Sequence, residues 1–180
     1  AHAPRARERR GRLRTGRGHD VNIWGALVGG LVGTLVLTSA LRAASELGLT
    51  RMDLPFLLGT AVTQNRVHAK AIGYGLHFAF GLLFALAYWV VFRVVGEDGW
   101  LVGAALGLLH GVFATTALVN VLLPLVHPYM ATPLTAAGES PLLEPPGFLM
   151  LNYGRATPAV TLAGHVAYGA IVGGFVSLAS

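Results

Sequence analysis

Three histidines stand in stretches of sequence that carry no charged residue: His77, His110 and His165. A polar, ionisable side chain inside an apolar membrane segment is costly, so it is expected to be hydrogen-bonded, paired or bound to a metal. A neutral imidazole can ligate haem iron or another transition metal, and it can also act only as a hydrogen bond between helices. These residues therefore predict cofactor or metal binding, with helix packing as the alternative.

Two of the three histidines share a local pattern. The sequence reads HFAFG from His77 and HVAYG from His165, and a Met-x-x-Pro pattern occurs at Met52 and at Met130. We interpret the chain as a tandem repeat of two helix–loop–helix units, related by a pseudo-two-fold axis along the membrane normal. His77 and His165 would then be symmetry mates at similar depth, and the pair is the candidate cofactor-binding site for haem b.

Further polar residues extend the candidate sites. A copper, iron or zinc ion could be held by a set of four histidines: His77, His110, His165 and His127. An outward-facing polar notch could be formed by Asn120, which falls on nearly the same helical face as His127, together with Asp53 and His68 of the first loop. The alternative for these notch residues is helix capping and loop packing.

Small residues accompany each membrane histidine at helical spacing. The stripes are Gly73, His77, Gly81 and Ala85; Thr161, His165, Gly169 and Gly173; and Gly103, Gly107, His110, Gly111 and Ala114. Such stripes let the backbones of membrane helices approach closely, so we expect all three histidines to face the interior of the bundle. A glycine one turn from each paired histidine would also leave room for a flat macrocycle.

The composition predicts an all-α membrane protein. Of the 180 residues, 54% are hydrophobic and only 12% are charged, whereas soluble chains carry roughly a quarter charged residues. Charge-free stretches and prolines place four transmembrane helices at about 21–41, 71–92, 100–123 and 159–178. Residues 21–180 therefore form a four-helix transmembrane domain.

The N-terminal residues 1–20 form a basic tail. Its seven arginines, against Glu8 and Asp20, give +5, which equals the net charge of the whole chain. The positive-inside rule favours cytoplasmic N- and C-termini in a bacterial inner membrane. The tail could bind anionic lipid or an acidic partner. Nucleic acid is not an expected partner, because the positive charge is not spread over a folded face.

Three segments resemble a known family: 52–62 (MDLPFLLGTAV), 73–88 (GYGLHFAFGLLFALAY) and 106–128 (LGLLHGVFATTALVNVLLPLVHP). The chain is similar there to a family of small four-span bacterial integral membrane proteins that has no established function. The resemblance implies the four-span architecture and assigns no site.

Three functions remain open. The chain has no cysteine, no nucleophile elbow, no glycine-rich phosphate loop and no suitably paired carboxylates, so enzymatic chemistry is not expected. The first function is a non-catalytic accessory or assembly subunit of a larger respiratory or photosynthetic membrane complex, with other membrane subunits or further copies of the chain as partners. The alternatives are a haem- or metal-binding membrane protein that uses the paired histidines, and a small transporter or channel.

Overall fold

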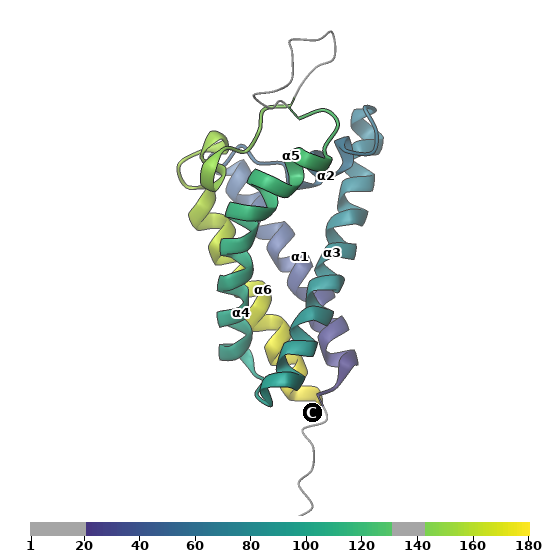
Figure 1. Cartoon of the computed structure of the whole chain (residues 1–180), viewed down its shortest axis with the longest axis vertical. Helices are drawn as coiled ribbons and strands as arrows, with labels where there is room; N and C mark the ends of the chain where they lie inside the picture. Colours follow the sequence, from purple (N-terminus) through teal and green to yellow (C-terminus); the bar gives the residue numbers. More distant parts are fainter. Residues whose placement is uncertain (1–20, 131–142) are drawn as a thin grey trace, which may run out of the picture.

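The computed structural model describes residues 21–130 and 143–180, and over these residues the fold is all-α (Figure 1). Four helical runs are long and apolar enough to cross a membrane, which confirms the predicted four-span architecture. They are α1 (Ile23–Glu46), α3 (Arg66–Val95), α6 (Thr157–Ala179) and the run Trp100–Val126, which consists of α4 (Trp100–Phe113), η1 (Ala114–Leu122) and α5 (Leu123–Val126). The basic tail 1–20 lies outside the described residues.

The helix termini follow from local sequence. Asn22 caps α1 by accepting a hydrogen bond from the backbone N–H of Trp24, and Asn65 caps α3 by accepting from Val67 and His68. Helix α3 ends at Gly96, whose φ of 76° is the left-handed conformation that glycine adopts without strain. Because α1 continues past Arg42 and α3 begins before Lys70, both helices are longer than the predicted spans.

The third span contains a π-helix that the sequence did not predict. Helix η1 adopts π geometry over nine residues, and the helical run continues through Pro124 to Val126. The prediction that Pro124 ends the span at 123 was therefore wrong. Pro124 occupies the first turn of α5, where the fixed φ of proline is tolerated.

Glycine stripes bring the helices together in the order α4, α6, α1, α3. A Cβ added at Gly103 or Gly107 of α4 would collide with the backbone of Gly169 or His165 of α6. Gly25 and Gly29 of α1 meet the backbone of α6 in the same manner. These contacts confirm that the small residues serve close helix packing.

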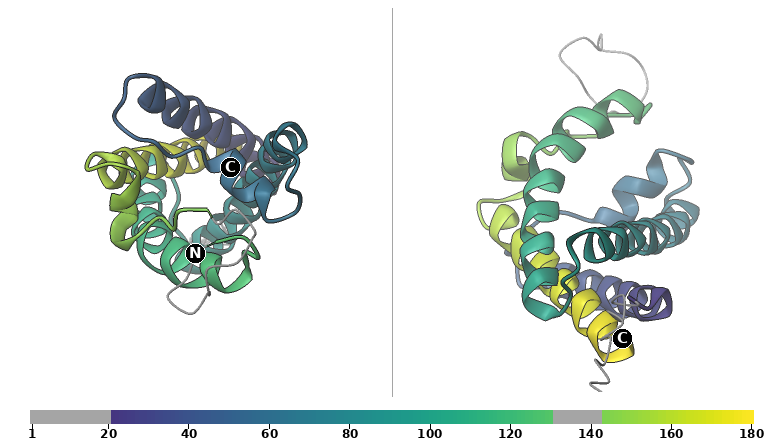
Figure 2. Two further views of the ribbon diagram at one scale, coloured as in Figure 1. Left: turned by 90° about the horizontal axis from the view of Figure 1, so that it is seen from above. Right: turned by 60° about the horizontal axis from the view of Figure 1, so that its bottom comes forward.

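Helices α3 and α4 leave one side of the bundle open. They are consecutive and joined by the short turn at 96–99, yet they diverge toward the opposite end of the molecule (Figures 1 and 2). The predicted two-fold axis would relate α1 to α4 and α3 to α6. A contact between α1 and α6 would then be matched by an equivalent contact between α4 and α3. The close backbone packing of α1 on α6 has no counterpart between α4 and α3, which meet through side chains such as Phe84 and His110. The described structure therefore does not have the predicted two-fold arrangement.

The two ends of the bundle differ. At one end, which we call the turn end, the indole of Trp89 donates to the carbonyl of Val21 at 2.7 Å and the amide of Asn22 donates to that of Ala179 at 3.3 Å. The described chain therefore begins and ends at the same end of the bundle. Which side of the membrane this end faces stays a prediction.

The opposite end, the loop end, carries the two long connections. The first contains α2 (Leu54–Thr60), which packs on α3 so closely that a Cβ at Gly73 would collide with the backbone of Pro55. The second contains η2 (Phe148–Tyr153), and the two connections are joined by a hydrogen bond from the N–H of Arg51 to the carbonyl of Tyr153 at 2.6 Å. Within the described residues, the two connections thus contact each other at the loop end.

Candidate functional site

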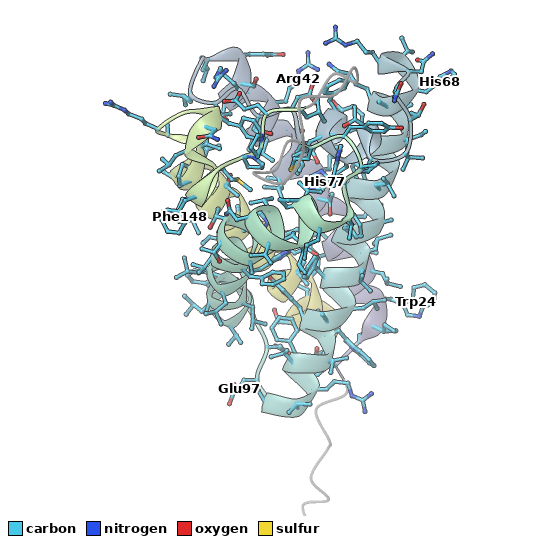
Figure 3. The ribbon with its side chains drawn as sticks, turned by 45° about the horizontal axis from the view of Figure 1, so that its top comes forward. Trp24, Arg42, His68, His77, Glu97 and Phe148 are labelled. Carbon is cyan, nitrogen blue, oxygen red and sulfur yellow. The ribbon has the colours of Figure 1, made fainter. Side chains whose placement is uncertain are left out.

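The four spans enclose a cavity of about 420 Å³, which we call the inner cavity. Its surface is almost entirely apolar, and it lies within the size range of small-molecule sites in proteins. The histidines His77, His110 and His165 all border it, together with Tyr168, and Figure 3 shows His77 between the helices, with His68 far from it at the loop end. The structure therefore brings the three membrane histidines to one cavity, as predicted.

His165 has a defined tautomer. Its Nδ1 lies 2.8 Å from the carbonyl oxygen of Thr161, one turn earlier in α6. Since a carbonyl can only accept, Nδ1 carries the proton and donates it. The other ring nitrogen, Nε2, is therefore left with a free lone pair.

His77 has the same tautomer for a less direct reason. Its Nδ1 lies 3.2 Å from the hydroxyl oxygen of Thr38 on α1. That hydroxyl has a single proton, which it donates to the carbonyl of Thr34 at 2.6 Å. The imidazole Nδ1–H must therefore donate to Thr38, and Nε2 of His77 again carries a free lone pair.

The Nε2 atoms of both histidines border open space. Neither makes a hydrogen bond within residues 21–130 and 143–180. Over the same residues, every fully buried side-chain nitrogen or oxygen has a hydrogen-bond partner. Since the two Nε2 atoms have none, they are not fully buried. Both residues line the inner cavity, so their two accessible, unprotonated nitrogens are candidates to bind a ligand there.

His110 differs from the pair. Its Nδ1 lies 3.2 Å from the hydroxyl of Tyr88, and either atom can be the donor. The ring stacks on Phe84 with centroids 3.8 Å apart and meets the ring of His165 edge-on at 4.6 Å. His110 thus holds the wall of the cavity beside His165.

The remaining polar groups of the cavity are already hydrogen-bonded. The hydroxyl of Tyr168 donates to the carbonyl of Gly81 at 2.5 Å, and the hydroxyl of Thr34 donates to that of Gly30 at 2.7 Å. Thr161 donates its hydroxyl to the sulfur of Met150 at 3.6 Å. The histidine nitrogens are therefore the groups left to bind a ligand.

The glycines beside the paired histidines do not leave room for a macrocycle, and that prediction was wrong. A Cβ at Gly81 would collide with the hydroxyl of Thr34, and one at Gly169 would collide with the backbone of Gly103. The space beside each glycine is filled by a neighbouring helix. Space for a ligand comes instead from the divergence of α3 and α4.

His127 does not join the other histidines, which corrects the predicted four-histidine set. It lies at the loop end, where Nε2 donates to the carbonyl of Leu57 at 3.1 Å and Nδ1 accepts from the N–H of Tyr129 at 3.2 Å. Both nitrogens are therefore occupied, and burial lowers the pKa of the imidazole. Within the described residues, no three His, Cys, Asp or Glu side chains come together as a metal site.

The predicted polar notch is not assembled either. The amide of Asn120 donates to the carbonyl of Thr115 within the π-helix at 2.7 Å. Asp53 caps α2 through the N–H of Phe56 and pairs with Lys70, while His68 is exposed at the start of α3. These residues have separate structural roles, as the capping alternative predicted.

Sequence reasoning missed the residues that orient the site. Thr38 and the carbonyl of Thr161 fix the two tautomers; Thr161 was placed on the stripe of His165 without this role, and Thr38 was not singled out. Met150 is buried with a left-handed φ of 61°, next to Leu149 at 53°, a conformation rare for residues other than glycine. No sequence signal marks that conformation.

A second hollow of about 230 Å³, which we call the outer pocket, adjoins the cavity at the loop end. It is lined by polar side chains that include Thr38, Arg42, Ser45, Glu46, Asp53, Lys70 and Tyr74. Four residues border both spaces: Leu41, Met52, Leu54 and His77. A single layer of side chains therefore separates the apolar cavity from a charged pocket.

Comparison of the chain with protein-family models, with curated proteins and with solved structures finds no match. The resemblance to four-span bacterial membrane proteins therefore stays a prediction, and the function has to be inferred from the site itself.

Proposed function

We propose that this chain is a non-catalytic membrane protein that binds a cofactor in the inner cavity through His77 and His165, and that the cofactor is haem. The observation that carries the proposal is the shared tautomer of the two histidines. Each donates Nδ1–H to a protein oxygen and keeps a bare Nε2, and both residues line the cavity.

That arrangement is typical of metal-ligating histidines. Such residues almost always donate their second ring N–H to a carbonyl, a carboxylate or water, which fixes the ring and makes the ligating nitrogen more basic. Haem iron needs only one or two axial imidazoles, because the porphyrin supplies the other ligands. An apolar wall around the macrocycle is the environment that the inner cavity provides.

A bare copper, iron or zinc ion is a weaker candidate. Protein zinc sites use three or four protein ligands, and the described residues bring no such group of His, Cys, Asp or Glu together. Two bare Nε2 atoms are enough for haem and too few for such a site.

The test is a titration of the detergent-purified full chain with haemin, followed by its absorption spectrum and by iron content per chain. We expect saturable binding with the spectrum of imidazole-ligated haem, abolished or changed to a one-histidine spectrum by His77→Ala or His165→Ala. His68→Ala is the matched control, because His68 is exposed at the loop end. Equal binding by all three variants would contradict the proposed site.

The open side of the bundle favours a second candidate, the accessory subunit of a larger membrane complex. Between α3 and α4 the cavity is bordered by exposed apolar side chains such as Leu83 and Phe113. A transmembrane helix of a partner subunit would cover this opening by the close packing that drives helix association in lipid.

The absence of cysteine from the chain allows a direct test of this candidate. A photo-crosslinker attached at Leu83→Cys should yield an adduct with a second membrane subunit in native membranes, whereas one at Val28→Cys, exposed on α1, should yield none. Adducts at neither position, or equal adducts at both, would count against a partner helix at the opening.

A further inference from the structure

One layer of side chains separates the inner cavity from the outer pocket, so a ligand in the cavity would lie close to charged groups. His77 belongs to this layer because it borders both hollows, and it donates its Nδ1–H to Thr38, which lines the outer pocket. The rest of the layer consists of the flexible apolar side chains of Leu41, Met52 and Leu54. A molecule bound by His77 in the inner cavity would therefore lie next to the outer pocket.

The outer pocket contains two cations that can change partners. Arg42 pairs with Glu46 at 2.8 Å on the same helix, and Lys70 pairs with Asp53 at 3.0 Å across α3 and the first connection. All four side chains are more than 40% exposed, and exposed ion pairs of this kind contribute little to stability. Releasing Arg42 or Lys70 to bind another anion therefore costs little.

The donors of the pocket suit a carboxylate. A guanidinium can bind a carboxylate through two parallel hydrogen bonds, and an ammonium offers a compact charge beside it. Tyr74 and Ser45 add hydroxyl groups to the same lining. The lining of the inner cavity contains no arginine or lysine, and its surface is almost wholly apolar.

We propose that the outer pocket is a carboxylate-binding subsite, so that pocket and cavity form one site for an apolar cofactor with acidic side groups. This inference rests on the proposed haem function: the macrocycle would be held in the cavity, and Arg42 and Lys70 would bind its two propionates. The alternative is that the outer pocket holds only water.

The experiment compares haemin with its dimethyl ester, which keeps the macrocycle and the iron and lacks both carboxylates. Each is titrated into the purified full chain and into the variants Arg42→Gln and Lys70→Gln. Arg93→Gln is the matched control, because it removes a cation from the other end of α3, where the guanidinium lies 4.9 Å from the centre of the Trp89 ring.

We expect the ester to bind the unmodified chain about tenfold more weakly than haemin, and each pocket variant to weaken haemin binding by about three- to tenfold. The same variants should leave the affinity for the ester unchanged, and Arg93→Gln should leave both affinities unchanged.

The outcomes separate the two proposals. Haemin and ester that bind equally, with no effect of Arg42→Gln or Lys70→Gln and loss of binding in His165→Ala, would overturn the carboxylate subsite and leave the haem site intact. A chain that binds neither compound would overturn the haem site and the subsite together. Because both cations are exposed, their removal tests the pocket without disturbing the helix packing.

Discussion

The protonation of the ring nitrogens in His77 and in His165 is set by one neighbouring oxygen each. His77 and His165 keep Nε2 bare because Thr38 and the carbonyl of Thr161 accept their Nδ1 protons, whereas His127 has both nitrogens occupied by the backbone. Two of these three histidines are therefore candidate ligands, and the third has a structural role. Residue type alone does not decide between these roles.

The hydroxyl of Thr38 should therefore matter for cofactor binding although it does not touch the cofactor. We expect Thr38→Val to lower haemin affinity about tenfold, because Nδ1–H of His77 loses its acceptor and the ring loses its fixed orientation. Absorption titration measures the change, and the spectrum should retain His165 as a ligand. Thr116→Val is the control, since its hydroxyl donates only to Val112 of its own helix; equal effects of the two variants would contradict the role of Thr38.

His127 predicts a pH dependence of stability. Burial lowers its pKa in the folded chain below the value of about 6.5 expected when unfolded. Below about pH 6.5, the unfolded chain binds a proton at His127 more readily than the folded chain does. The contribution of His127 to stability is therefore fully present above this pH and is lost as the pH falls. We expect His127→Gln to lessen the loss of thermal stability between pH 7.5 and pH 5. An unchanged slope in this variant would show that other groups cause the loss.

At the residue scale the sequence predicted which histidines lie together and not how they are held. The pattern shared by His77 and His165 predicted that both face one interior space, and both border the inner cavity. It could not predict Thr38 as a partner, because that contact joins α1 to α3 and depends on the register of two helices. The grouping of His127 with the others was wrong because its two ring nitrogens bind the backbone at the loop end.

At the scale of helices, glycine determines how closely neighbours approach. Gly107 of α4 faces the backbone of His165, and any side chain there would push α4 away from α6. A Cβ added at Gly75 of α3, by contrast, would have no neighbouring element within 4 Å. The two glycines stand in the same type of helix and differ only in what they face.

This contrast gives a matched pair of variants. We expect Gly107→Ala to destabilise the protein by about 1–3 kcal/mol through overpacking, whereas Gly75→Ala should be neutral or stabilising by up to about 1 kcal/mol, because alanine is the better helix former. Unfolding in mixed detergent micelles compares the two. A stabilised Gly107→Ala would show that α4 and α6 can separate without cost.

The π-helix η1 shows what periodicity cannot predict. Thr115 and Thr116 return hydrogen bonds from their side chains to carbonyls of the preceding turn, an interaction that bends helices, and the amide of Asn120 bonds to the carbonyl of Thr115. These polar groups all lie within the π-helix, immediately before Pro124. Hydrophobicity predicts that the span exists and does not predict these side-chain bonds or the π geometry that accompanies them.

At the scale of the whole molecule, the helix order could not be read from the sequence. Lipid is as apolar as the protein interior, so a membrane helix has no strong polar face to show which side is buried. All four spans carry small residues, and the tandem pattern suggested a two-fold arrangement. The described structure instead packs α6 between α4 and α1 and leaves α3 against α1 and α2.

This asymmetry predicts which part of the molecule moves. Helix α3 meets α4 through the side chains of Phe84, Tyr88 and His110 and without close backbone packing. Closure of the inner cavity on a ligand should therefore bring the rest of α3 toward α4 while α4, α6 and α1 stay together. Spin labels at Leu83→Cys and Leu109→Cys, both exposed, report the separation across the opening. We expect a broad distance distribution without haemin and a narrower, shorter one with it.

Labels at Leu109→Cys and Ala163→Cys provide the control, because they join α4 to α6 across the packed glycine contacts. Their distance distribution should be the same with and without haemin. If both pairs respond equally, the bundle deforms as a whole; if neither responds while haemin binds, the cavity is already in its binding geometry and α3 is not a moving element. A response of the Leu83 pair alone would link the open side directly to occupancy of the histidine site.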